Sequence, residues 1–358
     1  DPNLMRLARC TQPQQLHSMI SRWMLTLHRT QPKSTQVSPV LLLVRKIFAT
    51  LKGLPLLLEA LQYASNELLE IIRTELFGTV EWNLSGQQRI FETSETSLAA
   101  LIEISKMVDK NFWLPHLHSL DLSRVYTLMD KHLEIILPLC PNLTSLNISG
   151  CPRVTLHLAN LLPLHRMTPL QSLSVAQCLG ITDDFFIEIK PLLRFLTNVN
   201  VSECLEITDT TLFLLSRGAP ELHSLSINGC TGITSFQSLE LFLNLRSLEC
   251  CRLPSLDALH LAPLMRKNTP PLHRLVANGN PQLIDATFEM ITGTTSLTEV
   301  QIAESSITFA TITILVKFAP DLETLDISDC FKLSLDTIGE NLACFTKLKA
   351  LYTRGQTQ

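Results

Sequence analysis

The sequence predicts an α/β solenoid of about ten stacked repeats, with a parallel sheet on its concave face, helices on its convex face and an α-helical cap region at its N-terminus. Three observations support this fold class. A nine-residue apolar motif recurs at a nearly constant step, and its apolar residues have the spacing of a short strand. Helix-capping residues and prolines punctuate the segments between the copies.

The motif is clearest in residues 143–151, which read Leu-Thr-Ser-Leu-Asn-Ile-Ser-Gly-Cys. We number its positions one to nine, so that apolar residues stand at positions one, four and six and cysteine stands at position nine. The steps between successive copies range from 23 to 27 residues. The ten copies begin at Leu117, Leu143, Leu170, Leu196, Leu222, Leu245, Leu272, Leu297, Leu322 and Leu348.

The alternation at positions four and six predicts a short strand with one buried face. One such unit cannot bury its own apolar face, so neighbouring units must stack and their strands must pair into a parallel sheet. Behind each strand the chain is expected to return as a helix. Thr182 and Thr208, each followed by Asp, supply N-caps for two of these helices, and Pro141, Pro220 and Pro320 stop helices before the next strand.

Several stretches resemble the cysteine-containing leucine-rich repeats best known from F-box/leucine-rich-repeat proteins. They are Cys-Pro-Asn-Leu at 140–143, Ile-Thr-Asp at 181–183 and 207–209, and the ninth-position residues Cys151, Cys178, Cys204, Cys230 and Cys330. The resemblance covers about residues 112–357 and implies the repeat fold. It implies no single function, because such arrays serve many unrelated binding roles.

The ninth-position cysteines are expected to be structural. A small side chain there packs inward, and its thiol can donate weakly to backbone carbonyls of the turn. A zinc site needs close pairs such as Cys-x-x-Cys, and the ten cysteines include none. Disulfides between stacked repeats are sterically conceivable, but a ladder of buried thiols indicates a reducing intracellular compartment, for which the cytoplasm is preferred and the mitochondrion stays open.

Charge separates the start of the chain from the rest. Residues 1–58 hold eight basic residues and one acidic residue, a net charge of +7, and the remaining residues carry −11 because the total is −4. We expect a basic arm with an amphipathic helix at residues 1–34, a helical domain or cap at 35–111 and the repeat array at 112–358.

Three interpretations of the basic arm stay open. It can be a packed helix whose basic residues face solvent; these are Arg6, Arg9, Arg22 and Arg29. It can reach an acidic partner such as RNA, an acidic protein tail or anionic lipid. Its acid-poor composition, with Arg, Ser and Gln, is also typical of the neighbourhood of a mitochondrial targeting segment.

Part of the helical region resembles an F-box. Residues 66–76 are similar to the first helix of that motif, and Trp113 is similar to the tryptophan that often closes it. The Leu-Pro pair that normally opens the motif stands further upstream, at 54–55, and its middle is missing. The resemblance implies binding to an F-box adaptor if this divergent segment folds as an F-box.

Residues that flank the buried pair in each strand are expected on the concave face. In the first five copies they are almost all small, polar and uncharged, whereas the later copies carry a mixed-charge patch. We expect partner contacts at this patch, which comprises Glu249, Arg274, Glu299, Gln301, Asp326, Tyr352 and Arg354. Tyr and Arg are favoured at the hot spots of protein interfaces. The alternative, that these side chains are only solvated, stays open.

Motifs of the common enzyme classes are missing from the sequence. It holds no Gly-rich phosphate loop and no Gly-x-Ser-x-Gly nucleophile elbow, and glycine is scarce at 12 residues. His116 and His118 have the spacing of a strand-borne ligand pair, but no third ligand stands near them. No uninterrupted apolar stretch reaches membrane-spanning length. We therefore expect no enzymatic activity, no metal, no cofactor and no transmembrane segment.

Two functional hypotheses follow from these patterns. The first is a non-enzymatic protein–protein interaction scaffold, a structural or assembly subunit of a larger intracellular complex. The second is the substrate-recognition subunit of a cullin–RING ubiquitin ligase of the F-box type, which the resemblance implies. A role with nucleic acid would rest on the basic arm only, since the acidic repeat array argues against a broad RNA surface.

Overall fold

The structure is a computed structural model of the chain, and it divides into two compact units. It describes residues 81–83 (backbone only), 117–162, 169–256, 260–261, 272–289, 291, 295–334 and 345–355. The first unit comprises residues 1–143 and 165–168, and the second comprises 144–164 and 169–358. The basic arm, the F-box-like residues 66–76 and Trp113 lie outside the described residues, so the expectations for them stay predictions.

The described part of the first unit contains two strands and two short helices. Strands β1 (Glu81–Asn83) and β2 (Ser119–Asp121) pair in parallel, with Trp82 opposite Leu120. Helix α8 spans Asp130–Ile136, and the 3-10 helix η1 spans Leu137–Leu139. The strand β1 was not predicted, because residues 35–111 were expected to be helical. The copy of the motif that contains β1 has threonine instead of leucine at position one, residue 79, so it does not match the pattern.

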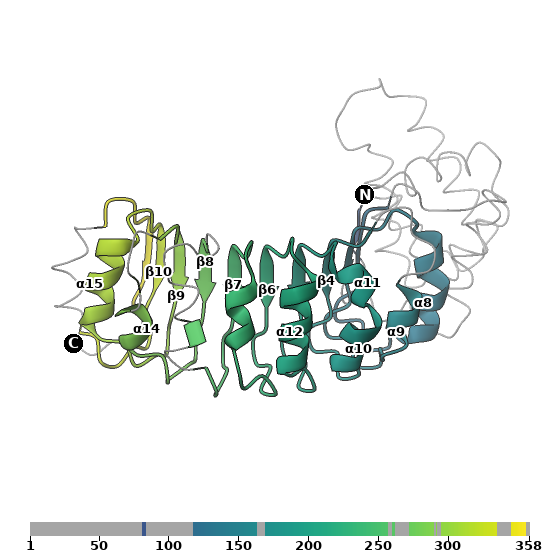
Figure 1. Cartoon of the computed structure of the whole chain (residues 1–358), viewed down its shortest axis with the longest axis horizontal. Helices are drawn as coiled ribbons and strands as arrows, with labels where there is room; N and C mark the ends of the chain where they lie inside the picture. The colour runs from purple at the N-terminus through teal and green to yellow at the C-terminus, as the bar shows by residue number, and fades with distance from the viewer. Residues whose placement is uncertain are drawn as a thin grey trace, which may run out of the picture. The chain divides into compact units, whose positions relative to one another are not determined.

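The second unit is built on a parallel sheet whose strands follow one another in sequence order (Figure 1). The strands are β3 (Ser145–Asn147), β4 (Ser172–Ser174), β5 (Asn198–Asn200), β6 (Ser224–Ser226), β7 (Ser247–Glu249), β8 (Arg274–Val276), β9 (Glu299–Gln301), β10 (Thr324–Asp326) and β11 (Ala350–Tyr352). In every pair the central residues, at position four of the motif, lie opposite each other. The predicted α/β fold with a parallel sheet is thereby confirmed, and it is compatible with a leucine-rich-repeat solenoid.

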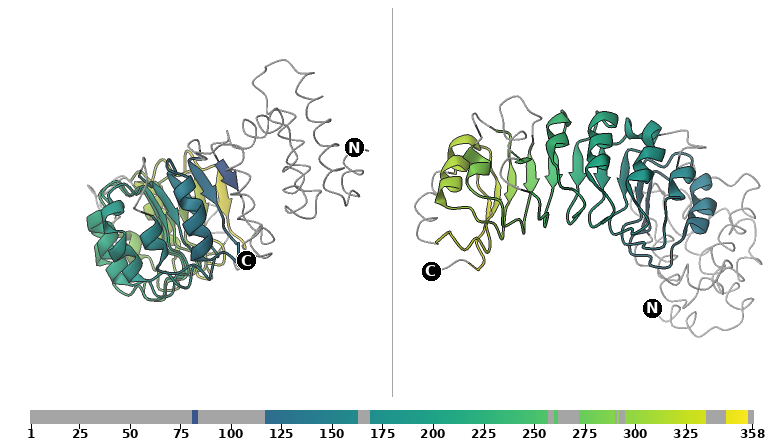
Figure 2. Two further views of the ribbon diagram at one scale, coloured as in Figure 1. Left: turned by 90° about the vertical axis from the view of Figure 1, so that its right-hand side faces the viewer. Right: turned by 60° about the horizontal axis from the view of Figure 1, so that its bottom comes forward.

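Helices of the second unit lie on one side of this sheet, and the strands line the inner side of its curve (Figure 2). The helices are α9 (Leu158–Leu161), α10 (Asp183–Glu188), α11 (Lys190–Leu193), α12 (Asp209–Gly218), η2 (Gln237–Leu241), α14 (Ala286–Glu289) and α15 (Phe309–Phe318). Thr182, Thr208 and Thr308 are the N-cap residues of α10, α12 and α15. Helices α12 and α15 end one residue before Ala219 and Ala319, which are each followed by proline, as predicted.

The core between sheet and helices is a set of apolar columns. Leucine, isoleucine and valine at positions one, four and six are buried in every repeat from Leu143 to Leu325 that keeps them. Full burial of one such side chain stabilises the fold by roughly 1.5–3 kcal/mol. Since each residue packs against its counterparts in adjacent repeats, this stabilisation requires the stack and is not available to a single repeat.

Thiols at position nine tie each repeat to the one before it. The Sγ atoms of Cys178, Cys204 and Cys230 donate to the position-six carbonyl of the preceding repeat, at 3.2, 3.2 and 3.1 Å respectively. Cys330 makes the corresponding bond to Ile302 at 3.4 Å. The short bonds therefore go to the neighbouring repeat, and Cys230 also makes the predicted contact within its own turn, to the Asn228 carbonyl at 3.9 Å. Burial raises the pKa of Cys178 and Cys230 to about 12 and that of Cys204 to about 11, so these thiols stay protonated.

Carboxylates at the start of the helices form a second link between repeats. Asp285 accepts hydrogen bonds from the hydroxyl groups of Thr308 and Thr311 in the next repeat, both at 2.6 Å, and from the backbone N–H of Thr308 at 2.8 Å. Asp183 makes the same contacts with Thr208 and Thr211. Burial by itself would raise the pKa of Asp285, but the bonds from Thr308 and Thr311 outweigh it and lower that pKa.

We predict that Asp285→Asn lowers the free energy of unfolding by about 1–3 kcal/mol at neutral pH, because the amide group turns a donor toward the threonine hydroxyls. Urea denaturation measures this change. Since the pKa of Asp285 is lower in the folded state, its stabilisation is complete above the unfolded pKa of about 3.9 and is lost as the pH falls through the folded pKa. The difference between wild type and variant should therefore shrink below about pH 4.

Asp184→Asn is the matched control, because this carboxylate is exposed at the start of α10. It should change the free energy of unfolding by less than about 0.5 kcal/mol. Equal urea midpoints for the two variants would show that the contacts of Asp285 with the next repeat add nothing to stability.

Candidate functional site

The mixed-charge patch predicted from the sequence lies on the concave face of strands β7 to β11. Glu249, Gln301, Asp326 and Tyr352 all stand at position five, and the strand register places them in one row together with Val276. Arg274 and Glu299 stand opposite each other at position three. Neighbouring strands of a sheet lie about 4.8 Å apart, so adjacent members of each row are within side-chain reach.

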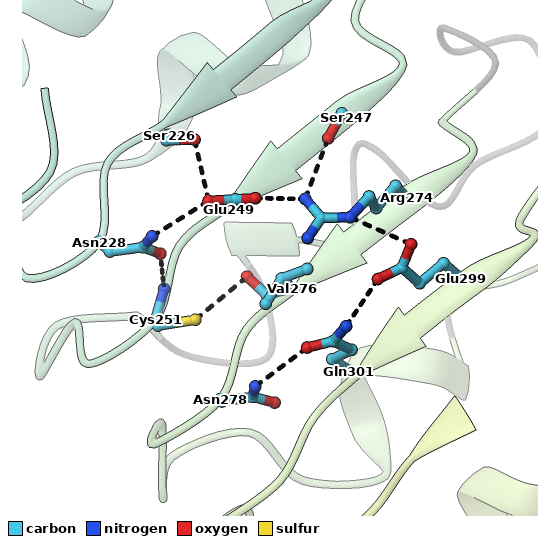
Figure 3. A network of polar contacts seen from close by, with 10 residues as sticks. All are labelled: Ser226, Asn228, Ser247, Glu249, Cys251, Arg274, Val276, Asn278, Glu299 and Gln301. Carbon is cyan, nitrogen blue, oxygen red and sulfur yellow. Dashed lines mark hydrogen bonds and ion pairs between the residues drawn. The ribbon is translucent and has the colours of Figure 1, made fainter. Parts of the chain in front are cut away.

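Arg274 is the centre of a polar network on this face (Figure 3). Its guanidinium forms ion pairs with Glu249 on one side and with Glu299 on the other, the latter at 3.1 Å between Nε and Oε2. The side chain of Arg274 is 34% exposed, and those of Glu249 and Glu299 are each 27% exposed. Arg274 thus pairs with two half-buried carboxylates, and the three side chains come from three consecutive strands.

Uncharged side chains complete the network on both sides (Figure 3). Ser226 Oγ and Asn228 Nδ2 donate to Glu249 Oε2 at 3.0 and 3.3 Å. Gln301 Nε2 donates to Glu299 Oε1 at 2.6 Å, and Asn278 Nδ2 donates to Gln301 Oε1 at 3.4 Å. The network therefore continues across four neighbouring strands, from β6 to β9.

These contacts keep the patch charged. Burial by itself would raise the pKa of Glu249, but Arg274, Ser226 and Asn228 outweigh it and lower that pKa. Burial would also lower the pKa of Arg274, but Glu249 and Glu299 outweigh it and raise that pKa. At neutral pH the centre of the network is thus two carboxylates and one guanidinium, with a net charge of −1.

The remaining predicted contact residues lie outside this network. Asp326 Oδ1 accepts the backbone N–H of Ser328 at 3.0 Å, as Asn147 and Asn200 do two residues before their own serines. Tyr352, at the end of β11, is 54% exposed. Arg354 follows it and is also exposed. The structure thus brings Glu249, Arg274, Glu299 and Gln301 together and leaves Asp326, Tyr352 and Arg354 outside the network.

A third row, formed by the residues at position eight, was not predicted from the sequence. The backbone at this position is left-handed in every described repeat. Four of these residues are glycines, and the others are Arg124, Gln177, Glu203, Arg252, Glu304 and Asp329, with φ between 54° and 59°. The Arg252 guanidinium pairs with Glu203 at 2.7 Å across Gly229, where an added Cβ would meet the Glu203 side chain at 3.1 Å. Glycine recurs at position eight, and this recurrence could have indicated the left-handed backbone.

The described residues contain neither a candidate metal site nor a candidate membrane span. Within them, no three His, Cys, Asp or Glu side chains come together as metal ligands. In the same part of the chain, no helix has the length and apolar character needed to cross a bilayer. His118 precedes β2 and is exposed, whereas His116 and the arm residues Arg6, Arg9, Arg22 and Arg29 lie outside these residues.

Comparison with known proteins shows a likeness in fold. No protein-family model matches the chain, and no curated protein matches it in sequence. Among solved structures it is similar to a chain in the crystal structure of the yeast Rad7 and Elc1 complex, with a TM-score of 0.53 and 16% sequence identity. That match covers 90% of this chain and 87% of the other. At this identity the likeness concerns the fold and not the function.

We predict that Arg274→Gln lowers the free energy of unfolding by about 1–3 kcal/mol, because it leaves Glu249 and Glu299 half-buried without a cation. Arg252→Gln should cost less than about 1 kcal/mol, since the Arg252 and Glu203 side chains are more exposed and such pairs contribute little. Urea denaturation of both variants at neutral pH measures the difference.

Adding Glu249→Gln and Glu299→Gln to Arg274→Gln should restore most of the lost stability, because no unpaired charge is then left on the face. If Arg274→Gln and Arg252→Gln had the same small effect, the network would not contribute to the stability of the sheet.

Proposed function

We propose that this chain is a non-enzymatic protein–protein interaction scaffold, a leucine-rich-repeat array that serves as a structural or assembly subunit of a larger intracellular complex. The observation that carries the proposal is the concave face of the second unit. It is a continuous parallel sheet whose outward side chains are ordered by contacts between repeats, and helices lie on its opposite side (Figure 2).

Rigidity is what makes this face suitable for binding. Side chains that are already fixed lose little conformational entropy when a partner docks. Glu249, Arg274 and Glu299 are fixed by ion pairs, and Asn228 and Asn278 are fixed because their Oδ1 atoms accept the backbone N–H groups of Cys251 and Ala303, at 2.7 and 2.8 Å. A partner therefore meets a surface with a defined pattern of donors and acceptors.

Two further observations support a role inside a complex in a reducing compartment. The similar yeast chain comes from a complex of two proteins, Rad7 and Elc1, so a fold of this kind is compatible with complex formation. The thiols of Cys178, Cys204, Cys230 and Cys330 are buried and form no disulfide, and burial raises the pKa of each. An environment without strong oxidants suits such thiols, which favours the cytoplasm and leaves the mitochondrion open.

The second candidate is the substrate-recognition subunit of a cullin–RING ubiquitin ligase of the F-box type. It is favoured by the ladder of position-nine thiols, since these are the residues that carry the resemblance to F-box/leucine-rich-repeat proteins. The F-box-like residues 66–76 and Trp113 would then bind the adaptor, and the concave face would bind the substrate.

Affinity purification of the full chain from native lysate, followed by size-exclusion chromatography and mass spectrometry, tests the first candidate. We expect a stoichiometric partner that co-elutes with the wild-type chain. Ser172→Arg combined with Thr324→Arg should release it, because both substitutions add a long charged side chain to the concave face at positions without a side-chain hydrogen bond in the described structure.

Ile187→Arg combined with Phe213→Arg is the matched control, because both residues are exposed on the convex helices α10 and α12. A partner that is lost from the convex variant and kept by the concave variant would refute binding at the sheet. An F-box adaptor among the co-eluting proteins would support the second candidate. A complex with other proteins and without an adaptor would remove it.

A further inference from the structure

On strands β9, β10 and β11, the concave face of the sheet is not covered by other described residues of the second unit. Gln301, Asp326 and Tyr352 lie opposite one another at position five of β9, β10 and β11, so their side chains leave the sheet on the same face. Tyr352 is 54% exposed. An aromatic ring on an open sheet face is a feature of binding surfaces.

The carboxylates that the last three repeats carry at positions five and eight differ from those at the centre of the polar network. Glu249 and Glu299 share Arg274, whereas Glu304, Asp326 and Asp329 take part in none of the ion pairs among the described residues. Glu304 and Asp329 are exposed. Both stand at position eight, in the turn that follows the strand, where the backbone is left-handed.

One cation shares this surface with the three carboxylates. Arg354 is exposed two residues after Tyr352, and its guanidinium is in none of the ion pairs of the described residues. The surface formed by Glu304, Asp326, Asp329, Tyr352 and Arg354, which we call the acidic aromatic surface, therefore has a net charge of −2.

The chemistry of this surface selects the class of occupant. Phosphate groups of nucleic acid would be repelled by the excess of carboxylates. Guanidinium and ammonium groups form charge-assisted hydrogen bonds with carboxylates and stack on aromatic rings. At position three, β10 and β11 hold Thr324 and Ala350, and these small residues let an extended backbone approach the sheet, whereas Glu299 of β9 is paired with Arg274.

We propose that the acidic aromatic surface binds an extended protein segment rich in arginine or lysine. Asp326, Asp329 and Glu304 accept hydrogen bonds from its basic side chains, and the ring of Tyr352 stacks with one guanidinium. The inference rests on the proposed function, since it names the chemistry of the partner that the concave face binds.

The test measures binding of a fluorescent Arg-Ser repeat peptide of about twelve residues, long enough to cross these strands, to the full chain by anisotropy. We expect saturable binding that weakens between about 50 and 300 mM salt, because exposed ion pairs are screened. A Glu-Ser repeat peptide of equal length should not bind. Equal binding of both peptides would overturn the proposal.

Three substitutions made together remove the charge of the surface with little change of shape. Glu304→Gln, Asp326→Asn and Asp329→Asn keep the side-chain size, and asparagine tolerates the left-handed backbone at residue 329. We expect the combined variant to bind the Arg-Ser peptide about tenfold more weakly. Tyr352→Ala should weaken binding about threefold through loss of the stacked ring.

Arg354→Gln gives a change of opposite sign, because it removes a cation that repels the peptide. Binding should become about threefold tighter. Asp184→Asn combined with Glu188→Gln removes two exposed charges from α10 and serves as the control, with unchanged affinity expected. Equal weakening by this control and by the triple variant would show unspecific attraction and overturn the proposal.

The same variants separate this inference from the proposed function. If the native partner is released by Ser172→Arg with Thr324→Arg but is kept by the triple amide variant, the scaffold function stands and the acidic aromatic surface is not its binding site. If the concave variant also keeps the partner, the proposed function itself fails.

Discussion

Each repeat of the second unit depends on its neighbour for hydrogen bonds that its own residues cannot make. The residue at position six shows this most directly. Ile148 donates its N–H to the Ser174 carbonyl at 2.9 Å, and its own carbonyl accepts the Cys178 thiol at 3.2 Å. Both partners belong to the following repeat. The buried backbone of one repeat is therefore satisfied only in the stack, and this requirement fixes the register of the strands.

Side chains follow the same rule where cysteine is absent. Asn280 takes position nine, and its Nδ2 donates to the Cys250 carbonyl of the preceding repeat at 2.8 Å, while its Oδ1 accepts the N–H of Leu253 at 2.7 Å. The amide thus replaces the thiol and adds an acceptor. Asp285 with Thr308 extends the linkage to the helical side. The repeats therefore tolerate changes of residue type as long as the bond to the neighbour is kept.

The sequence was sufficient for features that depend on spacing within one repeat. The strands β2 to β11, the threonine N-caps of α10 and α12 and the inward cysteines follow from local pattern and were predicted. The pairing of Arg274 with Glu249 and Glu299 depends on the steps between repeats, which are 27 residues from Leu245 to Leu272 and 25 residues from Leu272 to Leu297. These steps place the three side chains on neighbouring strands, so the pairing could have been predicted from the sequence, but the charges were assigned to a partner. The left-handed backbone at position eight was harder to predict, because arginine and glutamate, which stand there in several repeats, rarely adopt this conformation.

Because Glu249, Arg274 and Glu299 pair with one another, the concave face has fewer charged groups that can bind a partner. A carboxylate that is already neutralised by Arg274 gains little from a second cation, since binding would have to break or share an existing ion pair. Carboxylates at Glu304 and Asp329 have no such competitor among the described residues, and their backbone is fixed before any partner arrives. Internal pairing in the middle of the sheet therefore concentrates the unsatisfied charge at β9 to β11, and it is the difference between paired and unpaired carboxylates, rather than total charge, that selects where a basic segment binds.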